Sequence, residues 1–77
     1  MNRAYTEEQS AFLKQLGNRI RELRLSQRVS QEKLAFICDL DRTYVGSVER
    51  GERNISALNL KKLSVSLNVS LAQFFGD

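Results

Sequence analysis

The sequence contains no histidine and only one cysteine among its 77 residues. One cysteine cannot form a disulfide within the chain, and without histidine the chain cannot build a zinc site of mixed cysteine and histidine ligands. Histidine is also the usual general base of enzymes, so its absence closes most routes to acid–base catalysis. We therefore expect no metal site and no cofactor, and we do not expect an enzyme.

Cys38 could still serve as a nucleophile or as a redox sensor. It falls on the inward side of a predicted helix, however, and free cysteine is among the residue types most often buried in proteins. We interpret Cys38 as a residue of the hydrophobic core.

Long apolar runs are absent too. No stretch approaches the ~20 consecutive apolar residues of a membrane span, and the N-terminus lacks the apolar segment of a signal peptide. Proline and tryptophan are missing, whereas 42% of the residues are hydrophobic and 27% are charged, a balance typical of globular chains. We expect one small cytoplasmic domain, which needs good helix packing or a partner subunit for stability.

The net charge is +3, a mild excess, but the basic residues are unevenly distributed. They gather in two groups, namely Arg19, Arg21, Arg24 and Arg28, and then Arg42, Arg50 and Arg53. Local positive fields suit a phosphate backbone or an anionic membrane surface. Membrane binding by the first helix is the weaker reading, because its basic residues are mixed with Glu7, Glu8 and Glu22.

Helical periodicity runs through the chain, and no strand pattern is present. Residues 1–5 are expected to form a flexible tail, after which Thr6 and Gln9 fit a capping box. Further N-caps are expected at Ser30, Asp41 and Ser56. The predicted helices cover residues 7–26, 31–38, 42–50, 57–67 and 71–75. We therefore expect residues 6–77 to form an all-α compact domain of five helices.

Apolar residues at helical spacing define the expected core. They are Phe12, Leu13, Leu16, Ile20, Leu23, Leu34, Ala35, Cys38, Val45, Val48, Leu58, Leu60, Leu63 and Leu67. Gly17 costs its helix about 1 kcal/mol relative to alanine, which close packing against another helix would explain. Gly51 suits a left-handed C-cap. Phe36 and Ile37 fall on the outside, where they cover the edge of the core, as we prefer, or form an apolar contact surface.

Residues 31–38 and 42–50 are two short helices joined by a short turn, as in a helix-turn-helix unit. The second helix of such a unit lies in the DNA major groove, and its N-terminal residues contact base edges. Its polar face here consists of Arg42, Thr43, Gly46, Ser47 and Arg50. A merely solvated face would be better served by Glu, Lys and Gln, which are stronger helix formers. Small residues permit close approach and arginine can donate two bonds to guanine, so this face favours DNA contact.

A resemblance to a known family rests on the run SQEKLAFICDLDRTYVGSVERGERNISALNLKKLSVSLNVSL. It resembles the XRE-like helix-turn-helix family of phage repressors and their bacterial relatives, over residues 16–75. Within that family, the stretch LDRTYVGSVERGERNIS is most similar to the controller proteins of restriction–modification systems. The resemblance implies a sequence-specific transcriptional regulator in the bacterial cytoplasm, associated with the nucleoid. It would bind a pseudo-palindromic double-stranded operator in its own promoter, as a homodimer.

The resemblance also implies roles for individual residues. Arg42, Thr43 and Ser47 would face base edges together with Gly46, which replaces a side chain that relatives often use. Contacts to sugar and phosphate would come from Gln31, Tyr44, Arg50, Arg53, Asn54 and Ser56. Arg24 and Glu49 match a partly buried ion pair, although Arg24 could instead contact phosphate. Arg28 stands where relatives usually have glycine, at the first inter-helix turn.

The expected dimer interface lies at the C-terminal end of the chain. Its residues would be Asn59, Val69, Leu71 and Phe75, whereas Phe74 is expected to point into the core. An alternative remains open, in which the chain is a small phage-type repressor or an antitoxin whose main partner is another protein. Phe36 and Ile37 on an outer face are the residues that favour this alternative.

Overall fold

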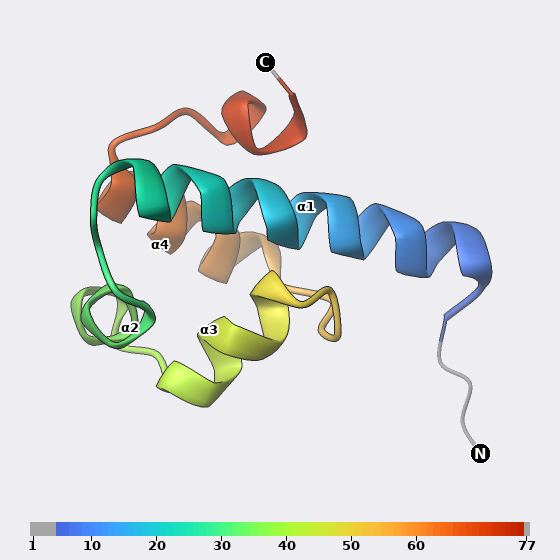
Figure 1. The fold of residues 1–77 in the computed structure, drawn as a ribbon, viewed down its shortest axis with the longest axis horizontal. Helices are drawn as coiled ribbons and strands as arrows, with labels where there is room; N and C mark the ends of the chain where they lie inside the picture. The colour runs from blue at the N-terminus through green and yellow to red at the C-terminus, as the bar shows by residue number, and fades with distance from the viewer. Residues whose placement is uncertain (1–4, 77) are drawn as a thin grey trace.

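The computed structural model describes residues 5–76 and arranges them as four α-helices and a short 3-10 helix (Figure 1). These are α1 (Glu7–Ser26), α2 (Gln31–Cys38), α3 (Arg42–Glu49), α4 (Ala57–Leu67) and the 3-10 helix η1 (Leu71–Phe75). Residues 5–76 contain no strand, which confirms the all-α class. The predicted flexible tail lies outside the described residues except for Tyr5, and Asp77 also lies outside them.

The prediction of five α-helices is wrong in its last element. The final segment has five residues between its N-cap Ser70 and the left-handed Gly76, which is too short to make an α-helix favourable, and it forms 3-10 turns. The predicted third helix is also one residue too long, because Arg50 is its C-cap rather than a helical residue. The other three α-helices have the predicted bounds.

Local hydrogen bonds fix where the helices begin. The Thr6 hydroxyl accepts the backbone N–H of Gln9 at 3.1 Å, and the Gln9 side chain accepts that of Thr6 at 3.0 Å. Ser30 and Ser56 likewise accept the N–H groups of Lys33 and Asn59. These caps agree with the sequence prediction. Asp41 does occupy the N-cap position of α3, but its side chain makes no capping hydrogen bond.

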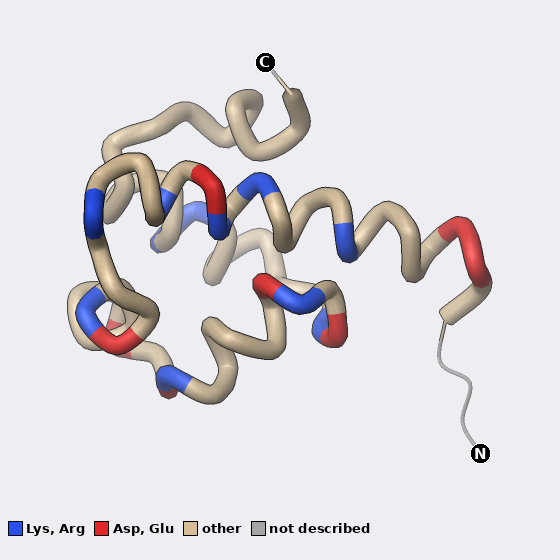
Figure 2. The backbone as a smooth tube through the Cα atoms, viewed as in Figure 1, with Lys and Arg blue, Asp and Glu red and all other residues tan. Residues whose placement is uncertain are grey.

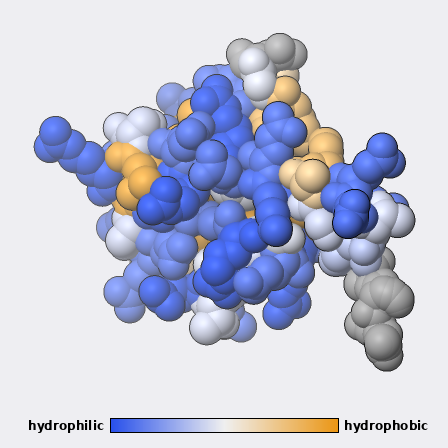
Figure 3. Space-filling model, turned by 45° about the vertical axis from the view of Figure 1, so that its right-hand side comes forward, coloured by the Kyte–Doolittle hydropathy of each residue, from blue (hydrophilic) through white to orange (hydrophobic). Residues whose placement is uncertain are grey.

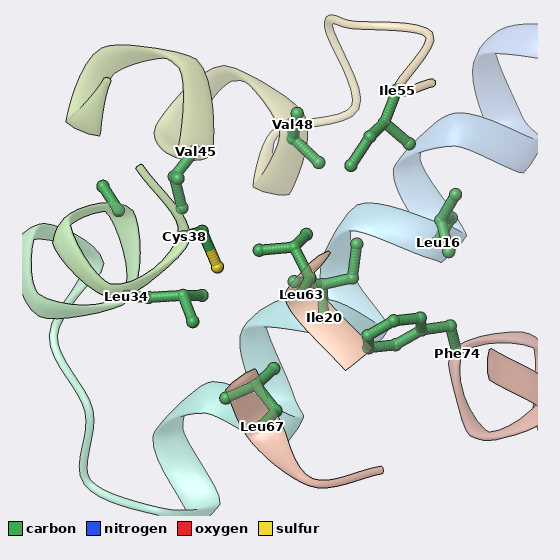
Figure 4. Packing of buried hydrophobic residues seen from close by; sticks show 11 residues of the cluster. Leu16, Ile20, Leu34, Cys38, Val45, Val48, Ile55, Leu63, Leu67 and Phe74 are labelled. Carbon is green, nitrogen blue, oxygen red and sulfur yellow. The ribbon is translucent and has the colours of Figure 1, made fainter. Parts of the chain in front are cut away.

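The core lies between α1, α2, α3 and α4 and is closed by η1 (Figure 4). Phe74 points from η1 toward Ile20 and Leu63, and only 2% of its surface is exposed, as predicted. Arg19 helps to hold η1 in place, because its Nε donates to the carbonyl of Gln73 at 2.8 Å. Cys38 is a buried core residue, which confirms its predicted place in the structure.

Four apolar residues that the sequence analysis assigned to the core or to its edge lie on the surface instead. Phe12 is 52% exposed and Leu58 is 78% exposed, although both were predicted to be core residues. Phe12 stands at the edge of the buried stripe of α1, beside Leu13, and stacks on Phe75 from η1. Phe36 is 82% exposed, so the preferred core-edge role is wrong for it, and Ile37 is half exposed. These positions leave apolar surface on both α2 and α4.

Two classes of feature are absent from residues 5–76. No helix there is both long enough and apolar enough to cross a membrane. That part of the chain also contains no group of three or more cysteine, aspartate or glutamate residues placed to hold a metal ion.

Gly17 allows α1 and α3 to touch through their backbones. A Cβ atom at this position would lie 2.3 Å from the carbonyl oxygen of Val48 and 2.7 Å from that of Glu49. Both distances are far below van der Waals contact, and backbone atoms cannot turn aside as a side chain can. The close helix packing predicted from this glycine is therefore present, and it fixes the C-terminal end of α3 against α1.

Arg24 of α1 and Glu49 of α3 form the predicted ion pair, in which both side chains are buried. The Arg24 Nε and Nη2 atoms donate to the two carboxylate oxygens at 2.6 and 2.9 Å. A third donor, Nη1, reaches the carbonyl of Val29 at 2.8 Å. Gln31 at the start of α2 also donates to Glu49, at 2.9 Å. One buried carboxylate thus ties α1, α2 and α3 together.

Arg28 lies in the turn between α1 and α2 and adopts a left-handed conformation there, although it is not a glycine. Its φ is 60°, in the left-handed region that glycine occupies most readily. Its N–H donates to the carbonyl of Leu25 at 2.9 Å, and the N–H of Val29 donates to that of Arg24. The turn therefore keeps the hydrogen bonds of a left-handed helix ending, at the cost of some backbone strain.

We predict that Gly17→Ala destabilises the protein although alanine is the better helix former. The added methyl group must separate α1 from α3, and such overpacking costs roughly 1–3 kcal/mol. Urea denaturation followed by circular dichroism measures the change. Gly46→Ala is the matched control, because the nearest atoms to its Cβ would be ends of flexible side chains at 3.2 Å or more. Equal stability of both variants would contradict the close backbone contact.

We also predict that Glu49→Leu destabilises the protein by about 3–5 kcal/mol, because it leaves the Arg24 charge buried without a partner. The double variant Arg24→Leu/Glu49→Leu should be more stable than Glu49→Leu alone, since it removes both charges. Urea denaturation of the wild type, both single variants and the double variant gives the coupling free energy. Simple addition of the two single costs would show that the pair does not couple the helices.

Candidate nucleic-acid interface

The outer face of α3 begins with two exposed polar side chains, Arg42 and Thr43. Val45 and Val48 on the opposite face are buried in the core, at 2% and 3% exposure. This division leaves the N-terminal turn of α3 projecting from the molecule, below α1 in the view of Figure 1. Residues at the start of a helix in this position can reach the edges of bases in a groove.

The middle of the same face carries only small residues, Gly46 and Ser47, and is partly covered by neighbouring side chains. Ser47 is only 7% exposed, and its hydroxyl donates to the carbonyl of Tyr44 at 2.7 Å. Gly46 is also buried, because side chains from other positions lie over it. A Cβ atom on Gly46 would lie 3.5 Å from Oε1 of Gln31. Of the four residues predicted to face bases, the structure therefore exposes Arg42 and Thr43.

Gln31 links the first turn of α2 to this face. Its side-chain amide donates to Glu49 and lies beside Gly46. The family resemblance implies that Gln31 bonds a phosphate and also braces the recognition helix, α3. The bracing contact is present in the structure, through the same carboxylate that binds Arg24.

Arg50 and Glu52 form an ion pair in the turn after α3. The Arg50 Nε and Nη2 atoms donate to the two oxygens of Glu52, both at 3.1 Å. Hydrogen bonding to Arg50 holds the pKa of Glu52 below its usual value, and the same bond raises the pKa of Arg50. Both groups are therefore charged at neutral pH. Figure 2 shows basic and acidic residues adjoining one another at the end of α3 and in the turn beyond it.

Tyr44 joins α3, the following turn and α4. Its hydroxyl accepts a hydrogen bond from the side-chain amide of Asn59 at 3.1 Å. The guanidinium of Arg53 lies over its ring, 5.5 Å from the ring centre, at a distance typical of a cation–π contact. The half-buried tyrosine thus positions Arg53 on the side of the molecule that carries α3.

The remaining predicted phosphate contacts are placed differently. The Ser56 hydroxyl caps α4 and is engaged with the N–H of Asn59. Asn54 is exposed and lines a shallow hollow with Tyr5, Glu8 and other residues of the first turns of α1. The structure therefore groups Gln31, Tyr44, Arg50 and Arg53 near α3, whereas Asn54 lies beside the N-terminal part of α1.

A separate apolar surface lies next to the C-terminal end of the chain (Figure 3). Phe75 stacks on Phe12 with ring centres 6.1 Å apart and an angle of 18° between the rings, yet both side chains are 52% exposed. Leu71 is 40% exposed. Of the other residues predicted for a dimer interface, Val69 packs partly against the core and Asn59 bonds to Tyr44.

Sequence reasoning missed Phe12 and Glu52. Phe12 had the spacing of a core residue, and only the position of η1 reveals that it meets Phe75 instead. Glu52 is two residues from Arg50, and residues at this separation do not face each other along a helix. The left-handed Gly51 between them, with φ of 78°, turns the chain so that they meet. In the sequence, Gly51 indicated the turn, but nothing there indicated that Arg50 and Glu52 form an ion pair across it.

Comparisons with known proteins show the family of the chain. Residues 20–74 match the helix-turn-helix family. The chain is 54% identical over 54 residues to Control protein C.BamHI of Bacillus amyloliquefaciens, covering 69% of this chain and 67% of that protein. It is 45% identical over 62 residues to Control protein C.MunI of Mycoplasma sp, covering 79% and 84%.

A solved structure is similar as well. The restriction-modification controller protein C.AhdI from Aeromonas hydrophila matches with a TM-score of 0.83 and 49% identity, over 84% of this chain and 98% of that one. The family match covers more than half of the chain, and C.MunI is matched over most of its length. The chain therefore belongs to the helix-turn-helix family and, within it, to the group of control proteins.

Proposed function

We propose that the chain is a sequence-specific regulator of transcription that binds double-stranded DNA, and that it is a restriction–modification controller protein. It would act at the nucleoid in the bacterial cytoplasm, as a homodimer on a pseudo-palindromic operator in its own promoter. The relatives C.BamHI, C.MunI and C.AhdI, which are named as control or controller proteins, support this assignment.

The outer face of α3 is the observation that carries the proposal. Arg42 and Thr43 project from its first turn, and the other end of the helix is fixed by the contact with Gly17 and by the buried pair of Glu49 with Arg24. A reading element needs such rigid support, because small displacements weaken directional hydrogen bonds. Arg42 is the residue best suited to a bidentate contact with guanine O6 and N7. The Thr43 hydroxyl can both donate and accept, so it can bond a donor or an acceptor on a base edge.

Phosphate contacts would come from residues around this helix. Arg53 carries its charge on the ring of Tyr44, which places it beside α3. Gln31 stands at the N-terminal end of α2, where free N–H groups and the helix dipole favour a phosphate. Such contacts position a protein on DNA without reading its sequence. Asn54 and Ser56 remain part of this proposal as contacts of the turn that precedes α4.

Dimerisation would use the apolar surface formed by Phe12, Leu71 and Phe75. One module of this size reads few base pairs, and a two-fold dimer presents two recognition helices about 34 Å apart to successive turns of DNA. Exposed aromatic residues that stack on each other are enriched in protein interfaces. This surface lies across α1 from α3, so a partner that covers it leaves the outer face of α3 free (Figure 1). Val69 would adjoin the interface, whereas Asn59, also predicted for it, bonds to Tyr44 of α3.

A protein-binding module such as an antitoxin is the second candidate function. The exposure of Phe36 and Ile37 on α2 favours it, because neighbouring large apolar side chains on a surface mark contact sites. Nothing about these two residues suits DNA, to which they would offer no charge and no hydrogen bond. The variants below separate the two candidates.

We predict that Arg42→Ala reduces operator affinity by ~1–3 kcal/mol and relaxes base preference at one position in each half-site, since it removes a base contact. Arg53→Ala should weaken binding to all sequences alike and lower the slope of log K against log salt by about 1, since it removes a phosphate contact. Selection from a random duplex pool, followed by binding titrations at several salt concentrations, measures both effects.

The control for that experiment is Lys62→Ala, which removes an exposed charge from α4 and leaves the charges of α3 and its turn unchanged. Its motif and affinity should match the wild type. If neither arginine variant changes DNA binding while a protein partner stays bound, the antitoxin reading replaces the regulator.

We predict that Phe75→Asp converts the dimer to a monomer, because it places a charge in the centre of the apolar surface. Sedimentation velocity measures the change of mass, and circular dichroism checks that the helices persist. Phe36→Asp is the matched control, since Phe36 is even more exposed but lies on α2. A dimer that survives Phe75→Asp would place the interface elsewhere.

A further inference from the structure

Arg50 lies over the middle of the recognition helix rather than beyond its end. Side chains of a helix point toward its N-terminus, so the long side chain of this C-cap residue reaches back along α3. Its Nη1 atom would be 3.2 Å from a Cβ atom at Gly46. The guanidinium therefore occupies the space that a side chain at position 46 would take, one helical turn away in sequence.

Glu52 holds this guanidinium in a defined orientation. The chain turns back at the left-handed Gly51, and the Glu52 N–H donates to the carbonyl of Ser47 at 2.9 Å, which anchors the backbone of the turn. The Glu52 carboxylate accepts hydrogen bonds from Nε and Nη2, along one edge of the guanidinium. The far end, with Nη1 and the second hydrogen of Nη2, makes no hydrogen bond to any other residue among 5–76. That end is itself a two-donor fork, which fits O6 and N7 of guanine.

The charge of the pair is poorly suited to a phosphate contact. Non-specific affinity for DNA comes mainly from positive charges that displace counterions. The positive charge of Arg50 is largely offset by the negative charge of Glu52, which is bonded to it and is ionised at neutral pH. An exposed ion pair also adds little to stability, so the pair has no evident structural purpose. A braced arginine with its donors aimed outward instead suits the reading of a base.

Building on the proposed function, we propose that Arg50 is a base-reading residue that recognises guanine, with Glu52 as its positioning partner and Gly46 as the gap that admits it. Arg42 at the first turn of α3 and the Arg50 guanidinium over Gly46 then lie about one helical turn, ~5.4 Å, apart along the same face. Each half-site would therefore contain two guanine positions read by arginine rather than one.

Selection from a random duplex pool with the wild type, Arg50→Ala and Arg53→Ala tests the proposal. We expect Arg50→Ala to lose the guanine preference at one position of each half-site, by roughly tenfold to a hundredfold in relative affinity. That position should differ from the one lost in Arg42→Ala. The salt dependence of non-specific binding should be nearly unchanged in Arg50→Ala, whereas Arg53→Ala should lower it and keep the motif.

Two further variants test the parts assigned to Gly46 and Glu52. Gly46→Gln fills the gap with a polar helix-forming side chain, so it should alter base preference at the same position as Arg50→Ala. Glu52→Gln removes the negative charge and weakens the brace, so it should reduce discrimination at that position while binding to unrelated DNA becomes tighter. Glu52 is exposed and Gly46 lies beside the ends of flexible side chains, so both variants should keep the helices, which circular dichroism checks.

The outcomes distinguish this proposal from the proposed function itself. If the wild type selects a symmetric motif and Arg50→Ala selects the same motif with uniformly weaker binding, Arg50 contacts phosphate and the inference is overturned while the regulator stands. If Gly46→Gln alters a different position from Arg50→Ala, the gap argument is wrong. If the wild type selects no motif, sequence-specific binding fails, and the inference fails with it.

Discussion

The placement of α3 depends on one buried ion pair, between Arg24 and Glu49. Removing two charges from water costs several kcal/mol for each ion, and only good geometry with further hydrogen bonds offsets it. Here the carboxylate receives two bonds from Arg24 and one from Gln31, and the last Arg24 donor reaches the carbonyl of Val29. No buried side-chain nitrogen or oxygen in the described part of the chain lacks a partner. This arrangement is satisfied only when α1, α2 and α3 are correctly placed together.

Gly17 acts on the same helix pair from two turns away. Because it lies seven residues before Arg24, it faces the same side of α1 and meets the backbone of Val48 and Glu49. The C-terminal end of α3 is therefore held both by a backbone contact and by a buried charge pair, while its N-terminal turn projects freely. Rigid support at one end and exposed polar groups at the other are the conditions under which a short helix can read a base edge.

Much of this fold was predictable from local chemistry. Periodicity and capping residues predicted the bounds of three α-helices, and Gly17 and Gly51 predicted a close contact and a left-handed turn that the structure contains. The Arg24–Glu49 ion pair was predicted from family resemblance, because nothing in the spacing of these two residues shows that they meet.

The exposure of Phe12 and Leu58 was not predictable, since periodicity identifies an apolar face but not how far the neighbouring helices cover it. The candidate site was predictable in its location on α3 but not in the internal bonds of Ser47 and Arg50.

Gly46 shows why such bonds escape a reading of the sequence. A glycine within a helix costs about 1 kcal/mol relative to alanine, so its presence needs a reason from packing or function. From the sequence alone, Gly46 is interpreted as a position without the base-contacting side chain that relatives often have. In three dimensions the same position is covered by Gln31 from α2 and by Arg50 from the end of α3. The absent side chain thus leaves room for Gln31 to reach Glu49 and for Arg50 to lie on the outer face, so the support of α3 and the position of Arg50 both depend on a residue that contributes no side chain of its own.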